Sequence, residues 1–132
     1  MRHKSPTLTE QELEIMKVVW ERGILTVRDV YETLLARRRI AYTTVMTMMK
    51  IMEDKKYLRR RLEGRAYVYE ATRPKKQMIR EMVSEFINRV FNGSAEPLLA
   101  HLVEDRRVSQ KDLTQLAKMI RNNSGEPREP KP

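Results

Sequence analysis

The 132-residue sequence contains no cysteine, which excludes disulfide bonds and thiolate metal sites. It has only two histidines, His3 and His101, and no spacing of carboxylates or histidines that suits a metal ion or a catalytic acid and base. No apolar run approaches the roughly 18 residues of a membrane span. The first residues, MRHKSPTLTEQ, lack the apolar segment of a secretory signal. We therefore expect a cytoplasmic protein that is not an enzyme and needs no cofactor or metal.

Positive charge is what the sequence has in excess, and most of it lies in one segment. The chain carries a net charge of +9. Residues 37–65 contain ten lysines and arginines against three acidic residues, so this segment holds seven of the nine charges. Charge concentrated in a patterned segment indicates an anionic polymer as partner. A basic face that only interacts with solvent is the alternative that charge alone leaves open.

Two capping boxes predict two short helices near the start of the chain. Thr9 and Glu12 open the first helix, which Gly23 can end. Thr26 and Asp29 open the second in the same way. Only a few residues separate the two helices, so we expect them to be neighbours in space.

A third helix is expected within the stretch IAYTTVMTMMKIMEDKKYL, residues 40–58, which is rich in methionine and threonine. At 100° per residue, Val45, Met48, Met49 and Met52 form one inward stripe. Methionine sulfurs can bind a soft metal, but a stripe at this spacing, on the face that a three-helix domain must bury, favours core positions. The residues expected on or beside the outer face are Thr43, Thr44, Thr47 and Lys50.

After this helix the pattern changes from helical to alternating. Residues 57–62 and 65–71 are predicted to form two strands around the turn Glu63-Gly64. Three helices followed by a two-stranded ribbon is the element order of a winged helix-turn-helix domain. The predicted fold class is mainly α, with a winged-helix DNA-binding domain over residues 1–73. A helical dimerisation domain over 74–121 and a disordered tail over 122–132 are predicted to follow.

The second domain is unusually apolar for its size. Asn92-Gly93 is expected to end its first helix and Ser94 to cap the next, while Ser109 and Asp112 form a third capping box. A unit this small has a marginal core, and oligomerisation is a common remedy. We therefore predict a homodimer, with packing against the first domain as the alternative. The residues assigned to the dimer interface are Ile79, Met82, Val83, Phe86, Val90, Leu99, Leu102, Leu113 and Leu116.

The predicted recognition helix has a chemistry that suits DNA. In a helix-turn-helix the second helix of the pair enters the major groove, where threonine and lysine can contact base edges or phosphates. Arginines flank it at 37–39 and on the ribbon at 59–61 and 65. Alternate side chains of a strand point to opposite faces, so residues 59–61 cannot all face DNA, and the alternation alone does not choose among them. The candidate DNA-binding residues are Thr43, Thr44, Thr47, Lys50, Arg39, Arg60 and Arg65.

Three segments together resemble the penicillinase-repressor family of winged-helix regulators. They are LTEQELEIMKVVWERGILTVRDVYETL, AYTTVMTMMKIMEDKKYLRRR and EGRAYVYEA. The resemblance implies a cytoplasmic homodimer that represses transcription from a palindromic operator in double-stranded DNA. It also implies release by proteolysis within the C-terminal domain, triggered by a membrane sensor-peptidase that detects beta-lactams or another cell-envelope signal.

The chain departs from the family pattern at several positions. The absence of cysteine excludes the mechanism of the family's copper-responsive branch. His101-Leu102 stands where family members usually have the cleaved Asn-Phe bond, and is the candidate release site. Lys55-Lys56 replaces a Lys-Gly pair at the end of the recognition helix. Because glycine there avoids a left-handed cost of about 1 kcal/mol, we expect the helix to end differently.

The leading prediction is a homodimeric winged-helix repressor. Two other classes share the fold, and the residues alone favour neither of them. One is a non-specific architectural DNA-binding or protein-interaction module, which would show no preference for a two-fold site. The other is a metal-sensing regulator, for which the sequence offers no ligand set.

Overall fold

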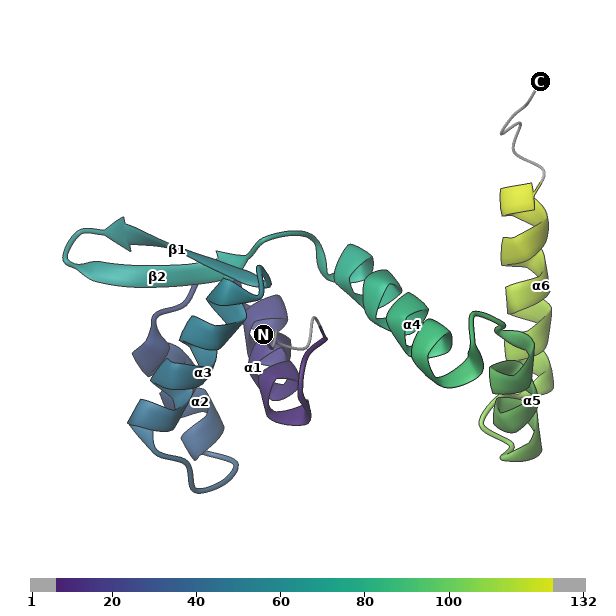
Figure 1. The fold of residues 1–132 in the computed structure, drawn as a ribbon, viewed down its shortest axis with the longest axis horizontal. Coiled ribbons are helices and arrows are strands. Elements are labelled where there is room, and N and C mark those ends of the chain that lie inside the picture. The colour runs from purple at the N-terminus through teal and green to yellow at the C-terminus, as the bar shows by residue number, and fades with distance from the viewer. Residues whose placement is uncertain (1–6, 125–132) are drawn as a thin grey trace. The chain divides into compact units, whose positions relative to one another are not determined.

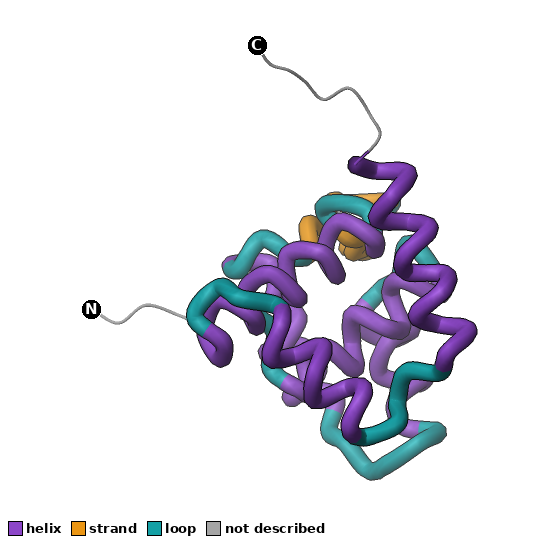
Figure 2. The backbone as a smooth tube through the Cα atoms, turned by 90° about the vertical axis from the view of Figure 1, so that its right-hand side faces the viewer, coloured by secondary structure: helices purple, strands orange, loops and turns teal. Residues whose placement is uncertain are grey.

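The computed structural model describes residues 7–124, which form six helices and one two-stranded sheet (Figure 1). The two strands form a single antiparallel hairpin, coloured orange in Figure 2. No helix of the described range is long and apolar enough to cross a membrane. The predicted mainly α fold, with three helices and then a two-stranded wing, is confirmed. In chain order the elements are α1 (Glu10–Arg22), α2 (Val27–Leu35), α3 (Tyr42–Asp54), β1 (Leu58–Glu63), β2 (Ala66–Ala71), α4 (Lys75–Phe91), α5 (Glu96–Glu104) and α6 (Gln110–Ser124).

The chain divides into two compact units, the first ending at Val83 and the second beginning at Ser84. The sequence places the domain boundary ten residues earlier, at residue 73, before α4 begins. Met78 explains the difference, because its side chain is fully buried in the core of the first unit and draws the start of α4 into it. At the other end, α6 continues to Ser124, beyond the predicted start of the tail at residue 122. The rest of the predicted tail lies outside the described residues.

All three predicted capping boxes are present. In α1, the Glu12 amide donates to Thr9 Oγ1 at 3.1 Å and the Thr9 amide donates to Glu12 Oε1 at 2.9 Å. Thr26 with Asp29 and Ser109 with Asp112 exchange equivalent pairs of hydrogen bonds. These bonds satisfy amides that the first helical turn leaves without partners, which fixes where each helix starts.

The predicted Ser94 cap is wrong. Helix α5 begins at Glu96 with Ala95 at the capping position and no side-chain hydrogen bond there. Pro97 lies in the first turn and has no N–H group, so one donor that a capping side chain would satisfy is missing.

The core of the first unit joins the three helices to the hairpin. β1 contacts α3, and β2 contacts α1 and α2. Val45, Met49 and Met52 are fully buried on the inner face of α3, as predicted, whereas Met48 lies only partly buried at the edge of the core. The methionines therefore hold the recognition helix to the domain, and its outer face is left to solvent.

A buried ion pair ties the end of α3 to the start of α1. The ammonium of Lys55 lies 2.8 Å from Glu12 Oε1, and both side chains are only 6% exposed. The same ammonium donates to the Thr7 carbonyl at 3.0 Å. The position and orientation of α3 are thus fixed by apolar packing along its length and by a charged contact at its C-terminus.

Candidate nucleic-acid interface

The outer face of α3 carries the four residues that the sequence assigns to DNA contact. Thr43, Thr44, Thr47 and Lys50 are all exposed, with Thr43, Thr47 and Lys50 on the side opposite the buried methionines and Thr44 beside them. Ala41 occupies the capping position and supplies no side-chain hydrogen bond to the first turn. The Thr44 amide donates to the Ala41 carbonyl at 3.1 Å, but no side chain caps the amides before it. Those amides and the positive dipole end of the helix can therefore receive an anion such as a phosphate.

The hairpin separates its three consecutive arginines between two faces. Arg59 Nε donates to Glu70 Oε2 at 2.8 Å, and Arg61 Nη1 donates to the same oxygen at 3.1 Å. The hydrogen bond from Arg59 lowers the pKa of the Glu70 carboxyl, and the charge of Arg61 adds to the effect. Arg60 lies on the other face, with its guanidinium 4.1 Å over the Tyr67 ring and its Nε 3.6 Å from Glu53 of α3. Arg60 is thus the member of the run that faces α3.

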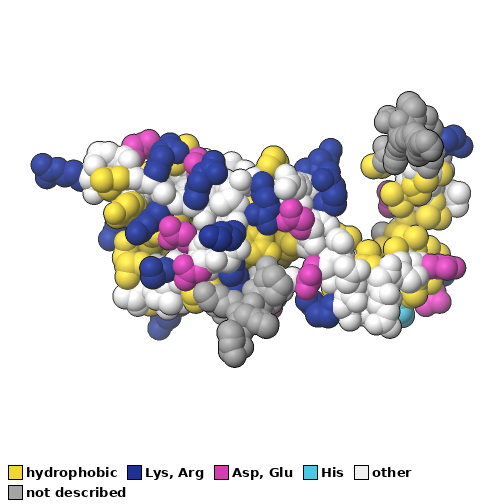
Figure 3. Space-filling model, turned by 45° about the horizontal axis from the view of Figure 1, so that its top comes forward, with side chains coloured by type: hydrophobic (Ala, Val, Ile, Leu, Met, Phe, Trp, Pro, Cys, Tyr) yellow, Lys and Arg dark blue, Asp and Glu magenta, His cyan; other side chains and the backbone are white. Residues whose placement is uncertain are grey.

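Arg65 lies at the tip of the wing, next to Gly64, whose φ of 65° makes the turn that the sequence predicts. Its side chain is exposed, and within residues 7–124 no acidic group pairs with it. Arg39 is likewise exposed in the loop before α3, whereas its neighbour Arg38 is held 2.9 Å from Glu14. Figure 3 shows lysine and arginine side chains spread over the face of the first unit that carries the wing.

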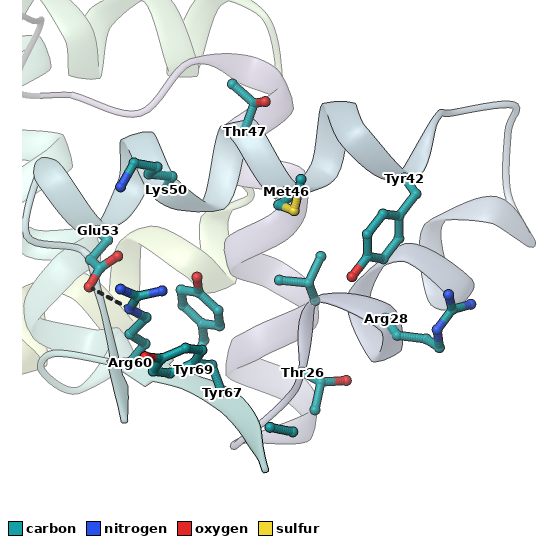
Figure 4. A pocket seen from close by; sticks show the side chains of 12 residues that line it. Thr26, Arg28, Tyr42, Met46, Thr47, Lys50, Glu53, Arg60, Tyr67 and Tyr69 are labelled. Carbon is teal, nitrogen blue, oxygen red and sulfur yellow. Dashed lines mark ion pairs between the residues drawn. The ribbon is translucent and has the colours of Figure 1, made fainter. Parts of the chain in front are cut away.

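A cavity of about 600 Å³ opens between α3, the start of α2 and the wing (Figure 4). Thr47, Lys50 and Arg60 of the candidate DNA-binding set line it. Sequence reasoning did not find the cavity, because the wing residues that close it are distant from α3 along the chain and only tertiary packing brings them together. The lining residues that the sequence did not assign to DNA contact are Thr26, Val27, Arg28, Tyr42, Met46, Glu53, Ala66, Tyr67 and Tyr69.

Tyr42 is held firmly at the α2 side of this cavity. Its ring lies edge-on to Tyr31 with centroids 5.4 Å apart, and the Arg28 guanidinium lies 5.2 Å from its centroid. Arg28 is also 3.6 Å from Glu32 on the next turn of α2. The start of α2 therefore adds a cation to the basic groups of α3 and the wing.

Most of the residues predicted for dimerisation have exposed apolar side chains. On α4, Ile79, Val83, Phe86 and Val90 follow helical spacing along one face, and all are exposed. Met82 and Leu102 are half-buried. On α5 and α6 the exposed apolar side chains are Leu99, Val103, Leu113, Leu116, Met119 and Ile120, which are 38–62% exposed.

His101 and Leu102, the candidate release site, lie inside α5. His101 is exposed, and its ring centroid is 6.2 Å from that of Phe91. The carbonyls of both residues accept backbone hydrogen bonds, from the amides of Asp105 and Arg107, each at 3.0 Å. A peptidase would need this turn of helix to unwind before the bond fits an extended substrate cleft.

Comparison with known proteins links the chain to one family. Residues 8–122 match the sequence profile described as penicillinase repressor. The penicillinase repressor of Bacillus licheniformis is 25% identical over 126 residues, 96% of this chain and 98% of that protein. The transcriptional regulator BlaI of Mycobacterium tuberculosis is 33% identical over 103 residues, 76% of this chain and 75% of that one. A solution structure of the DNA-binding domain of the repressor BlaI covers 56% of this chain and 90% of its own, at 28% identity and a TM-score of 0.49.

Proposed function

The chain belongs to the penicillinase repressor family, and on that basis we propose that it is a cytoplasmic transcriptional repressor that binds a palindromic operator as a homodimer. The relatives named penicillinase repressor and transcriptional regulator support this function by name.

The observation that carries the proposal is the outer face of α3, where three threonines and a lysine stand exposed beside an uncapped helix start. In the major groove, Thr47 can exchange hydrogen bonds with base edges or touch a thymine methyl, and Lys50 can reach guanine or a phosphate. Thr43 and Thr44 lie where the open amides of α3 would receive a phosphate.

The wing and the loop before α3 supply the backbone contacts. Arg60 and Arg65 extend the basic surface from α3 to the wing tip, and Arg39 extends it to the other side. Contacts of this kind neutralise phosphates and fix register without selecting sequence. Base choice is therefore assigned to α3, and general affinity to the arginines.

Dimerisation is assigned to the exposed apolar residues of α4, α5 and α6. Exposed apolar side chains gathered on small helices indicate a protein contact. A second copy of the chain would cover them and would present two α3 helices to successive major grooves. Their half-sites would lie about 34–36 Å apart, or at a multiple of that spacing.

Release by proteolysis at His101-Leu102, triggered by a membrane sensor-peptidase that responds to a beta-lactam or another envelope signal, completes the proposal. Cleavage within α5 would separate α6 from the rest of the chain and so remove part of the apolar surface assigned to the dimer. Because the bond lies in a hydrogen-bonded helix, we expect cleavage to require local unwinding of α5.

Selection of bound duplexes from a random pool, followed by footprinting, tests the DNA-binding proposal directly. We expect a two-fold symmetric consensus with protection on both half-sites. Protection without any two-fold preference would support the non-specific architectural module instead. Failure to retain any duplex at low salt would overturn both.

A further inference from the structure

The cavity between α3 and the wing has the size of a small-molecule site. Its volume of about 600 Å³ falls within the roughly 300–1,000 Å³ that is typical of ligand pockets. It is bounded by three separate elements, so a ligand inside would touch α2, α3 and the wing at once.

One side chain in the cavity offers a hydrogen-bond donor that no described residue uses. Tyr69 is only 5% exposed, yet its hydroxyl forms no hydrogen bond with any described residue. Figure 4 shows the Tyr69 ring among the lining side chains, with its hydroxyl on the side of α3. A hydroxyl that opens into a cavity without a protein partner can donate a hydrogen bond to an acceptor atom of a ligand.

The backbone of Tyr69 is fixed on both sides, so the hydroxyl is held in place before a ligand arrives. The Tyr69 amide donates to the Leu25 carbonyl at 2.7 Å, and the Leu25 amide donates back to the Tyr69 carbonyl at 3.0 Å. On its other edge, Tyr69 is paired with Arg60 of β1. A rigid donor loses little conformational freedom when it binds, which favours affinity.

The remaining walls favour a flat ring. Met46 points into the cavity from α3, and the rings of Tyr42 and Tyr67 stand on opposite sides of it (Figure 4). Thioether and aromatic side chains pack well against an aromatic ligand. The guanidinium of Arg60 already lies over Tyr67, so the floor of the cavity is a stack of planar groups.

The charges at the rim favour one negative group. Arg60 is balanced by Glu53 at 3.6 Å, but among residues 7–124 no carboxylate pairs with the ammonium of Lys50. The hydroxyl of Tyr42, which also points into the cavity, is a second neutral donor. We propose that this cavity binds a small aromatic carboxylate, with its ring against Met46 and its acceptor oxygens facing Tyr69 and Lys50.

A ligand in this position would compete with DNA. Thr47 and Lys50 line the cavity and are also assigned to base and phosphate contact, so one face cannot serve both partners. The carboxylate would also neutralise a charge that the DNA backbone needs. This regulatory step rests on the proposed DNA-binding function, whereas the binding site itself does not.

Calorimetric titration of the full chain with 2-naphthoate, in the absence of DNA, tests the site. We expect saturable binding, with 2-naphthalenemethanol and cyclohexanecarboxylate binding more weakly because one lacks the charge and the other the aromatic ring. Tyr69→Phe should weaken 2-naphthoate binding about tenfold, since it removes a hydrogen bond to a charged acceptor. It should not lower the melting temperature, because the hydroxyl bonds to no described residue.

Tyr57→Phe is the matched control, since Tyr57 is also buried but does not line the cavity. We expect it to leave the affinity for 2-naphthoate unchanged. No saturable binding up to millimolar 2-naphthoate, or equal losses in the two tyrosine variants, would overturn the site.

Competition is measured separately with a duplex recovered by random selection. Increasing 2-naphthoate should raise the apparent Kd for that duplex in the wild type, and about tenfold more ligand should be needed in Tyr69→Phe. If 2-naphthoate binds without displacing the duplex, the regulatory step is wrong. If no duplex is recovered, the proposed function fails while the titration still decides the cavity.

Discussion

Lys55 and Glu12 form an ion pair that is almost closed to solvent, at the point where α3 ends against the start of α1. Removing one partner of such a pair leaves the other as a buried charge, which costs about 3–5 kcal/mol. We expect Lys55→Met to lower the free energy of unfolding of the first unit by that amount. Urea titration followed by the fluorescence of Trp20, which lies in this unit, measures the change.

Two further variants test whether the loss of stability comes from the unpaired buried charge. Adding Glu12→Gln to Lys55→Met removes the unpaired charge, so the double variant should lose less stability than the sum of the single losses. Arg38→Met breaks an exposed pair with Glu14 and should cost less than about 1 kcal/mol. Equal small losses for Lys55→Met and Arg38→Met would show that the buried pair contributes little.

Lys56 adopts a backbone conformation that favours glycine. Its φ is 72°, directly after the last residues of α3. The Tyr57 amide donates to the Met52 carbonyl and the Lys56 amide to the Glu53 carbonyl, both at 3.0 Å, which is the left-handed ending that glycine usually makes. The expectation that lysine here changes the ending of the helix is therefore wrong. The helix ends with the same hydrogen bonds that a glycine would allow, and the backbone of Lys56 is strained as a result.

Substituting this residue should therefore stabilise the protein. We expect Lys56→Gly to raise the free energy of unfolding by about 1 kcal/mol, because glycine adopts positive φ without a steric cost. Lys17→Gly, at an exposed position inside α1, should lower it by about the same amount. Chemical denaturation of both variants beside the wild type measures the two signs, and a loss of stability in Lys56→Gly would contradict the strain argument.

At the scale of elements, local patterns account for most of what could be predicted. A capping box joins residues three positions apart. The side chains of a strand point alternately to its two faces. Both patterns are local, so both can be recognised in the sequence. The Glu12–Lys55 pair joins residues 43 positions apart, and only the packing of α1 against α3 brings them together. The cavity could not be predicted for the same reason, because its lining residues come from three elements that are distant along the chain.

The wing illustrates how the structure completes a local argument. Alternation predicts that residues 59–61 divide between two faces, but it does not say which face meets α3. The pairing of Arg60 with Tyr69, and the contact of Arg60 with Glu53, decide this. Arg59 and Arg61 are instead engaged with Glu70 on the opposite face.

The division between α3 and the wing predicts two kinds of DNA-binding defect. Thr47→Ala should change sequence preference at one position of each half-site, because base contacts set specificity. Arg65→Ala should weaken binding to all duplexes alike and reduce the salt slope by about one. Arg59→Ala, on the far face of the wing, is the control and should change little. Titrations of matched and mismatched duplexes at several salt concentrations distinguish these patterns, and identical profiles for Thr47→Ala and Arg65→Ala would refute the division.

At the scale of the whole molecule, the two units differ in how well they bury their apolar residues. The first has a continuous core in which apolar side chains of α1, α2, α3 and the wing are almost completely buried. In the second, the described residues include no fully buried apolar side chain. The sequence pattern predicted an excess of apolar residues there, because four such positions per seven exceed what one helix face needs.

This difference leads to a test of the assembly. We expect the wild type to sediment as a dimer at the concentrations used for DNA binding. Leu113→Glu combined with Leu116→Glu places charges on the exposed apolar face of α6 and should yield monomers. Operator affinity should then fall by about a hundredfold or more, because the second half-site no longer binds through a linked copy.

Gln115→Glu adds a charge on the same helix at a polar exposed position, and serves as the matched control. It should leave both the sedimentation coefficient and the operator affinity unchanged. A wild type that stays monomeric while binding a two-fold operator tightly would mean that DNA, rather than the apolar surface of α4, α5 and α6, brings the two copies together. In that case the double leucine variant would bind the operator as well as the wild type does, and the exposed apolar residues would need another partner.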